Sequence, residues 1–335
     1  MRLMEKIGYI LVTIFVVLTS SCSDEILEDK VMVDATRPYE RELKVLCIGN
    51  SFTEDAFSYV PALFFMAAPD VKLTIGIAYI GGSPLVQHWA NLTGKSTTLD
   101  GTTISPKTYT YYKAESVTAQ WHSCKNVSID KILSDEQWDI ITFQQNGGTS
   151  GRDYDTYFAP YLVEIKQFVR SKTKGDPKLG WVLIHGAYYN SDDGLRMSWY
   201  NGMLNSRRVM EDAGFDLLFP YGTAVQNLRD NREILNESAG PGWTFDNGHL
   251  QEGLGCLVSA YANALVLFNE LKMTPERELW QFNIDKELLD FMSVPDQHID
   301  SSGLTGISDK NCRKAYEAAL AAVAEPYSVT LASIE

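Results

Sequence analysis

Two short motifs, far apart in the chain, carry residue types that together can perform acyl transfer. The first is Gly49–Ser51 (GNS), between an apolar run and a helical pattern, and the second is Asp246–His249 (DNGH). A nucleophilic serine needs a histidine to accept its proton, and that histidine needs a carboxylate on its other ring nitrogen. An aspartate three residues before the histidine, on a loop that enters a helix, allows both side chains to face one cleft. Ser51, His249 and Asp246 are therefore the candidate nucleophile, base and orienting carboxylate.

Each motif taken alone also has a simpler structural interpretation. Ser51 or Thr53 could serve only as a helix N-cap, and Asp246 could cap the later helix while His249 lies on the surface. A serine at a strand-to-helix turn nevertheless has its hydroxyl at the carboxyl edge of the sheet. Backbone N–H groups at that helix start can stabilise an oxyanion.

The elements that must position these motifs alternate between short apolar runs and amphipathic segments. This pattern is typical of a parallel sheet covered by helices on both faces. We predict an α/β fold: a three-layer α/β/α, doubly wound, flavodoxin-like five-stranded parallel sheet, in which ligands bind beyond the carboxyl ends of the strands. The predicted strands are residues 44–49, 73–80, 139–145, 180–185 and 216–220, and the predicted helices are residues 54–68, 154–172, 197–213, 251–272 and 309–324.

Residues 91–135 interrupt this alternation. Residues 97–112 are rich in threonine and tyrosine and contain the turn dipeptide Asp100-Gly101, which predicts a β-hairpin insertion. The insertion follows the loop after the second strand, so it lies on the side of the sheet where a site would form. It either shapes a substrate cleft or decorates the sheet edge, and the sequence favours neither role.

Together, the motifs resemble the SGNH/GDSL hydrolase superfamily, which has a GDS block after the first strand and DxxH before a late helix. The combination of GNSFT, QQ and DxxH is similar to a branch of exported lipoproteins of unknown function. The resemblance implies an oxyanion hole made by the Ser51 backbone N–H, a glycine after the second strand and an asparagine after the third. Gly82 and Asn146 are the matching positions, with Gly81 and Gln145 as alternatives.

The resemblance covers residues 44–270 and has two departures from the family pattern. Asn50 stands where the family has an aspartate, which changes little because that residue is not the base. The third block reads QQNGG over residues 144–148 and lacks the usual GxND motif. This loss favours an alternative function, a non-catalytic glycan-binding or assembly lipoprotein with an SGNH-like fold. The intact serine, aspartate and histidine argue against that alternative.

The resemblance implies a serine esterase that acts on a small-molecule or glycan ester. By analogy with exported members of the superfamily, the expected activity is carbohydrate O-deacetylation; a lipase or thioesterase would fit the triad equally well. The five histidines and five cysteines show no metal-ligand spacing, so no metal and no cofactor are expected.

The start of the chain resembles the export signal of a bacterial lipoprotein. Two basic residues precede an apolar run, and Leu18–Cys22 (LTSSC) resembles a lipobox, in which the cysteine is acylated. We expect residues 1–21 to be the signal peptide, 22–42 a flexible tether and 43–335 one SGNH hydrolase-like domain. An ordinary cleaved signal peptide is the simpler alternative. The prediction is an exported outer-membrane lipoprotein, periplasmic or surface-facing, that contacts the membrane through lipidated Cys22 alone.

Charge and cysteine usage restrict the partners further. The chain has 29 basic and 43 acidic residues, a formal net charge of −14, and no basic patch, which excludes nucleic acid as an expected partner. Cys47 and Cys256 lie in apolar stretches and are predicted to be buried thiols, while pairing of Cys124 with Cys312 stays open.

Overall fold

The computed structural model describes residues 39–230, 244, 246–275, 277–282, 293–295 and 307–330. All of these belong to one compact unit, Arg37–Glu335. The predicted signal peptide, the lipidation site Cys22 and nearly all of the predicted tether lie outside the described residues.

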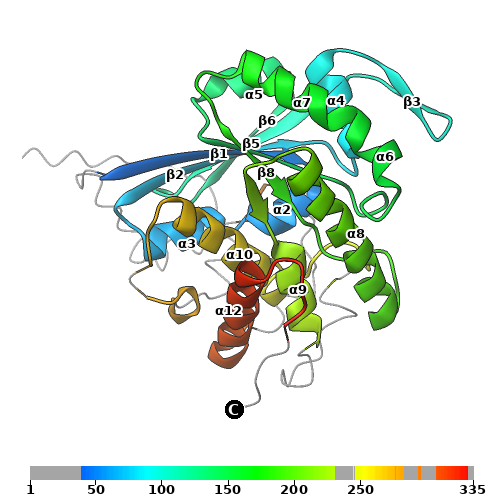
Figure 1. The fold of residues 1–335 in the computed structure, drawn as a ribbon. Helices are drawn as coiled ribbons and strands as arrows, with labels where there is room; N and C mark the ends of the chain where they lie inside the picture. Colours follow the sequence, from blue (N-terminus) through cyan, green and yellow to red (C-terminus); the bar gives the residue numbers. More distant parts are fainter. Residues whose placement is uncertain are drawn as a thin grey trace, which may run out of the picture. The chain divides into compact units, whose positions relative to one another are not determined.

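Parallel strands form the centre of the main sheet (Figure 1). Their spatial order is β2-β1-β7-β8-β9, and neighbouring strands in this order run parallel. This is the doubly wound, flavodoxin-like order that the alternating sequence pattern predicts. The strands are β1 (Arg41–Gly49), β2 (Val71–Tyr79), β7 (Ile140–Gln144), β8 (Lys178–Val182) and β9 (Leu217–Phe219), which confirms all five predicted strands.

The prediction of a five-stranded, all-parallel sheet is wrong at one edge. Within the described residues the main sheet has seven strands, because β5 (Tyr109–Glu115) pairs antiparallel with β2, and β6 (Trp121–Val127) pairs antiparallel with β5. The five central residues of β6 are all exposed. A strand without an apolar face gives no hydrophobic periodicity, so the sequence pattern does not reveal it.

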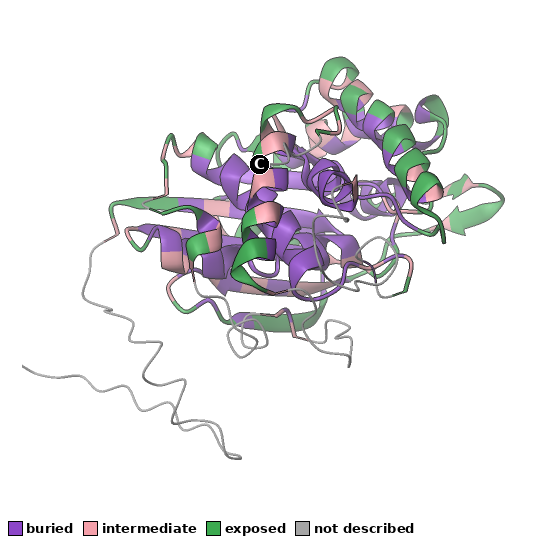
Figure 2. Ribbon diagram, turned by 90° about the horizontal axis from the view of Figure 1, so that it is seen from below, coloured by how far each residue is buried: buried purple, intermediate pink, exposed green. Residues whose placement is uncertain are grey.

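Helices cover both faces of the sheet (Figures 1 and 2). Each face has its own core: Ile48 and Trp181 belong to one, Val45 and Cys47 to the other. The first face is covered by α4 (Leu85–Thr93), α5 (Ile129–Asp135), α6 (Tyr154–Tyr157), α7 (Ala159–Lys172) and part of α8 (Asp192–Asp212). The second is covered by α2 (Ser51–Phe57), α3 (Val60–Ala67), α9 (Tyr221–Asp230), α10 (Leu254–Glu270) and α12 (Asp309–Ala324), with the short turn η3 (Leu279–Gln281) beside α12.

The helix predictions are confirmed in place but not in every boundary. The predicted helix over residues 309–324 is α12, which packs on α9 and α10. The segment predicted as one helix over residues 54–68 forms two, α2 and α3. The short helices α4 and α9 were not predicted; with nine and ten residues, each is shorter than the window over which helical periodicity is read.

The predicted β-hairpin insertion is confirmed. β3 (Thr97–Leu99) and β4 (Thr102–Ile104) pair antiparallel around Asp100 and Gly101, whose φ angles are 50° and 73°. Positive φ at both positions is what a two-residue type I′ turn requires. The hairpin stands beside α4 and α6 (Figure 1), and the Tyr157 hydroxyl of α6 donates a hydrogen bond to Asp100 at 2.5 Å.

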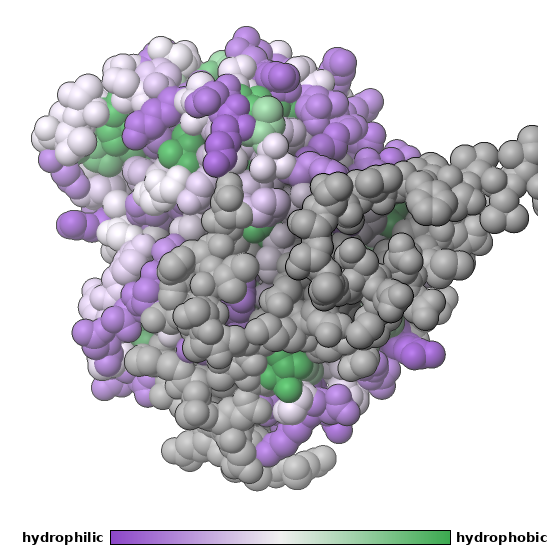
Figure 3. Space-filling model, turned by 180° about the vertical axis from the view of Figure 1, so that it is seen from behind, coloured by the Kyte–Doolittle hydropathy of each residue, from purple (hydrophilic) through white to green (hydrophobic). Residues whose placement is uncertain are grey.

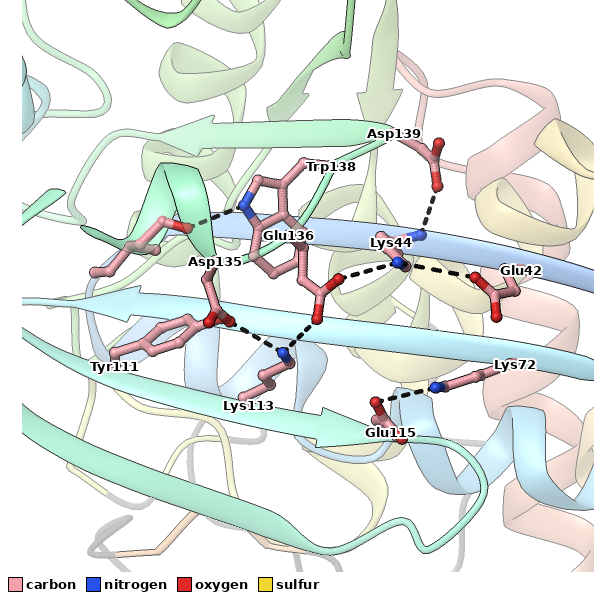
Figure 4. Close-up of polar contacts among 11 residues, drawn as sticks. Glu42, Lys44, Lys72, Tyr111, Lys113, Glu115, Asp135, Glu136, Trp138 and Asp139 are labelled. Carbon is pink, nitrogen blue, oxygen red and sulfur yellow. Dashed lines mark hydrogen bonds and ion pairs between the residues drawn. The ribbon is translucent and has the colours of Figure 1, made fainter. Parts of the chain in front are cut away.

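An ion-pair network lies near the amino-terminal ends of the parallel strands and ties β5 to the sheet (Figure 4). The Glu136 carboxylate accepts hydrogen bonds from Lys44 at 2.9 Å and Lys113 at 2.5 Å. Asp135 accepts from Lys113 at 3.0 Å and from the Tyr111 hydroxyl at 2.8 Å. Burial raises the pKa of Glu136, but the bonds from Lys113 and Lys44 outweigh it and hold this pKa below its ordinary value.

The polar surface and the burial of most cysteines are consistent with a sheet covered by helices on both faces. On the face shown in Figure 3, the described residues are mostly hydrophilic, and hydrophobic ones form small separate groups. None of the described helices combines the length and the apolar character that a membrane span needs. Of the cysteines in the described residues, Cys47, Cys256 and Cys312 are buried and Cys124 is exposed, and no two of them form a disulfide. The two buried thiols predicted from sequence are confirmed.

Candidate active site

The turn between β1 and α2 delivers Ser51 to the carboxyl edge of the sheet. Asn50 is the N-cap of α2, and its Oδ1 accepts a hydrogen bond from the Phe52 backbone N–H at 3.0 Å. The Ser51 hydroxyl is therefore not the helix cap. Gly49 must lack a side chain, because a Cβ there would lie 2.0 Å from Thr53 Oγ1.

The structure brings Ser51, His249 and Asp246 into one hydrogen-bonded line. His249 Nε2 lies 2.7 Å from Ser51 Oγ, and His249 Nδ1 lies 2.6 Å from Asp246 Oδ2. The other oxygen of Asp246 accepts the backbone N–H groups of Gly248 at 2.9 Å and His249 at 2.6 Å. Burial raises the pKa of Asp246, but these hydrogen bonds outweigh it and hold the pKa below its ordinary value. An ionised carboxylate on Nδ1 leaves Nε2 free to accept a proton from the serine.

The loop over residues 246–249 is held from two sides. His185 Nε2 donates to the Gly248 carbonyl at 2.7 Å, and the Leu250 backbone N–H donates to Asp55 Oδ2 at 2.9 Å. His185 follows β8 and Asp55 lies in α2, so the sheet and the nucleophile helix both fix the loop. Neither His185 nor Asp55 belongs to a motif that the sequence reveals.

His185 performs this task as a neutral side chain. Burial, and then the charge of Arg229, lower its pKa to about 3. A neutral imidazole has one N–H, and because the Gly248 carbonyl can only accept, that hydrogen is on Nε2. His185 therefore positions the loop and is not a second base.

Gly82 and Asn146, the two residues expected beside the serine, lie next to each other. Asn146 Nδ2 donates to the Gly82 carbonyl at 2.8 Å, and Asn146 Oδ1 accepts from the Thr149 backbone N–H at 2.9 Å. These bonds fix the amide, and the second hydrogen of its NH₂ group is left for a ligand. Gly82 has a φ of 62°, a left-handed conformation that glycine adopts freely. Asn50 Nδ2 donates to the Ser83 carbonyl at 2.9 Å, which ties this loop to the serine turn.

The two alternatives for the amide donor are separated by their contacts. Gln145 is buried; its Oε1 accepts the N–H groups of Leu85 at 2.8 Å and Asn146 at 3.1 Å, and its Nε2 donates to the Tyr157 carbonyl at 3.3 Å. Its amide is engaged inside the protein at the start of α4. The geometry therefore favours Asn146 over Gln145 as the side-chain donor.

Two other residues near the Gly82 loop belong to the core. His88 is buried, with Nε2 2.9 Å from Ser83 Oγ and Nδ1 3.2 Å from the Tyr109 hydroxyl, and burial lowers its pKa to about 3. Trp89 is also buried, and its indole N–H donates to Glu164. No group of three or more histidine, cysteine, aspartate or glutamate side chains suited to a metal ion occurs in the described part of the chain.

Tyr188, a residue that the sequence patterns do not single out, lies beside the triad loop. Its backbone N–H donates to the Asn247 carbonyl at 2.5 Å, and its ring stacks on the Phe52 ring with centroids 6.1 Å apart. The Phe52 ring in turn meets the His249 imidazole edge-on at 5.7 Å. Tyr188 lies in a connecting loop, where no periodic pattern marks a functional side chain.

The fold and the order of the motifs define the class of this protein as an α/β protein with an SGNH-like hydrolase fold. The serine follows the first parallel strand, the glycine and the asparagine follow the next two, and DxxH precedes a late helix. Residues 44–275 match the family described as "Domain of unknown function (DUF4886)", and the chain belongs to this family.

The chain is also similar to solved structures. A DUF4886 family protein from Bacteroides uniformis ATCC 8492 is similar over 86% of this chain and 97% of its own, with 25% identity and a TM-score of 0.63. Axe2, an acetylxylan esterase from Geobacillus stearothermophilus, is more distant, with 13% identity, a TM-score of 0.40 and coverage of 72% of this chain and 99% of its own. No curated protein matches the chain.

Proposed function

We propose that this protein is a serine esterase that works by acyl transfer through Ser51. One observation carries the proposal: the hydrogen-bonded line from Asp246 through His249 to Ser51 Oγ, with links of 2.6 and 2.7 Å. Both links are short enough for hydrogen bonds. The bonds that hold Asp246 and His249 in place leave the serine hydroxyl with a ready proton acceptor.

The proposed reaction has two halves that use the same residues. Ser51 Oγ attacks the ester carbonyl while its proton moves to His249 Nε2, and the alcohol then leaves with that proton. A water molecule next gives a proton to His249, attacks the acyl-serine, and releases the acid and the free serine. In both halves the oxyanion receives hydrogen bonds from the backbone N–H groups of Ser51 and Gly82 and from the Asn146 amide.

For the substrate we propose an acetyl ester on a carbohydrate, outside the cytoplasm. The support is the resemblance of the sequence motifs to exported esterases, together with the lipobox-like segment ending at Cys22. The acidic balance of the chain also favours a neutral substrate over a polyanion. Attachment to the outer membrane through Cys22 is part of the same proposal.

The test is hydrolysis of 4-nitrophenyl acetate by the purified protein and its variants. We expect turnover by the parent, and a loss in kcat of about a thousandfold or more in Ser51→Ala and in His249→Ala. Ser171→Ala, at the exposed end of α7, is the control and should match the parent. If the catalytic variants keep the parent's rate, Ser51 and His249 are not the catalytic pair. A parent that cleaves neither this ester nor acetylated oligosaccharides, yet binds the latter, would favour a glycan-binding lipoprotein.

A further inference from the structure

The loop after β8 places a solvent-exposed tyrosine ring beside the triad loop. We propose that Tyr188 is a substrate-contacting residue, whose exposed ring face stacks on the sugar ring that carries the ester. This inference rests on the proposed function and deepens it, because it names the group that the site recognises. It also assigns a role to a side chain that neither the triad nor the oxyanion hole uses.

The backbone of Tyr188 is held in an unusual conformation. Its φ is 66°, in the left-handed region that bulky residues rarely adopt. Asn247, which accepts the Tyr188 N–H, is itself left-handed with a φ of 62°. Strained residues of this kind persist where their surroundings fix them, and they concentrate at active sites and ligand clamps.

Two glycines make room for the ring. A Cβ on Gly147 would lie 2.7 Å from Tyr188 Cε2, and a Cβ on Gly248 would lie 2.8 Å from Tyr188 Cε1. One edge of the ring therefore touches the loop that carries Asn146, and the other touches the loop that carries His249. A side chain at either glycine would push the ring out of this position.

The Tyr188 side chain is exposed to solvent although both edges of its ring contact neighbouring loops. Tyr188 is 56% exposed while its ring packs on Phe52, so it offers a fixed aromatic surface to solvent. A tyrosine ring offers a flat apolar face, which suits the C–H face of a sugar. The net charge of −14 makes an anionic ligand unfavourable here.

More exposed large side chains follow along the chain from Tyr188. Tyr189 is 50% exposed and packs over Gly194 at the start of α8, where a Cβ would lie 2.8 Å from its side chain. Tyr200 is 46% exposed, and its neighbour Asn201 lies 3.0 Å from a Cβ placed on Gly151. α8 therefore borders the loop that flanks the Tyr188 ring.

A purely structural role for Tyr188 can be separated from substrate contact. The bond to Asn247 comes from the backbone N–H, so it survives loss of the ring. Asparagine tolerates the left-handed conformation better than other non-glycine residues. Tyr188→Asn therefore removes the ring and keeps the backbone, while Tyr188→Phe keeps the ring and serves as the matched control.

The experiment compares two substrates, partially acetylated xylo-oligosaccharides and ethyl acetate, which has no ring to stack. For Tyr188→Asn we expect KM for the oligosaccharides to rise about tenfold, kcat to stay within about threefold, and ethyl acetate hydrolysis to match the parent. Tyr188→Phe should keep the parent's KM. An equal loss on both substrates would show that the residue only positions the triad loop, and no change on either would also overturn the proposal.

A binding measurement keeps this inference distinct from the esterase proposal. The dissociation constant for the same oligosaccharides is measured by calorimetry in Ser51→Ala, with and without Tyr188→Asn. If the parent hydrolyses neither substrate but Tyr188→Asn weakens binding about tenfold, the esterase proposal fails and the ring contact stands. If the parent hydrolyses ethyl acetate but Ser51→Ala binds no oligosaccharide, the esterase stands and the ring contact is overturned.

Discussion

The two ends of the parallel strands hold their charged groups in different ways. Near the amino ends, Glu136 is held by two lysines, Lys44 and Lys113, so charge is matched by charge. At the carboxyl ends, Asp246 is held by two backbone N–H groups and one imidazole. In the first arrangement, Lys113 is shared between Glu136 and Asp135, and the network mainly stabilises the fold. In the second, one carboxylate oxygen accepts two backbone N–H groups and the other faces the imidazole, so loss of a single atom should change chemistry more than stability.

Asp246→Asn should break the site most severely. The amide cannot hold His249 in the tautomer that accepts a proton at Nε2, so we expect kcat to fall by about ten thousandfold while the fold is kept. The measurement is ester hydrolysis together with circular dichroism. Asp135→Asn, at the opposite end of the strands, is the matched control and should keep the parent's kcat. A small effect of Asp246→Asn would mean that another group orients the histidine.

Asn146→Ala should come next. It removes one oxyanion donor without touching the triad, so kcat should fall by about a hundredfold to a thousandfold. KM should change less, because the interaction is strongest in the transition state. Steady-state kinetics on one ester give both constants. A loss of less than threefold would mean that Asn146 only ties its loop to Gly82.

His185→Gln should have a smaller effect on rate and a clear effect on pH dependence. Loss of the bond to the Gly248 carbonyl should lower kcat by about tenfold. The pKa of His185 is about 3 in the folded protein and near 6.5 when unfolded, so the unfolded chain binds the proton first. This residue therefore costs stability as pH falls below 6.5, by up to about 1.4 kcal/mol per pH unit down to pH 3.

Urea unfolding at pH 7, 6 and 5 measures this linkage. The free energy of unfolding of the parent should fall more steeply with acid than that of His185→Gln, because glutamine does not titrate. Ser171→Ala, at the exposed end of α7, is the control and should keep the parent's slope. Equal slopes for the parent and His185→Gln would mean that His185 takes up its proton at the same pH in the folded and unfolded chains.

Glu136→Gln should have the smallest effect on activity and acts on stability instead. The side chain is 21% exposed, between the surface and buried cases, so we expect a loss of roughly 1–2 kcal/mol and an unchanged kcat. Because the folded pKa of Glu136 is lowered, its contribution is present at neutral pH and disappears as pH falls through that folded pKa. A loss of kcat in this variant would contradict the conclusion that the amino ends of the strands contribute to stability and only the carboxyl ends to catalysis.

The sequence predicts those parts of the fold whose signals are local. Continuous apolar runs predict the parallel strands, and the dipeptide Asp100-Gly101 predicts the hairpin turn. β5 and β6 were missed because distant contacts hold them: β5 pairs with β2 and binds Glu136 through Lys113, and β6 pairs with β5. At this edge of the sheet, segments with few apolar residues form strands because of tertiary contacts.

The residue types of the candidate site could be predicted from the sequence, but the orientations of their side chains could not. GNS and DxxH identify the residues that the structure places within hydrogen-bond distance. The choice between Asn146 and Gln145 depended on which side chain turns inward to the start of α4, and no local pattern encodes that. Tyr188 lies in a loop and Asp55 on a buried helix face. Their contacts with the loop over residues 246–250 can be recognised only in the folded structure.

The antiparallel strands at the β2 edge also affect how copies of the protein meet one another. Without them, an apolar parallel strand would offer its unpaired backbone to any neighbouring chain. With them, the outermost strand is β6, which exposes the polar residues His122–Asn126 beside an irregular register with β5. The opposite edge, β9, is only three residues long. Short, polar and irregular edges resist strand-to-strand aggregation, which suits a protein proposed to be attached to a membrane surface.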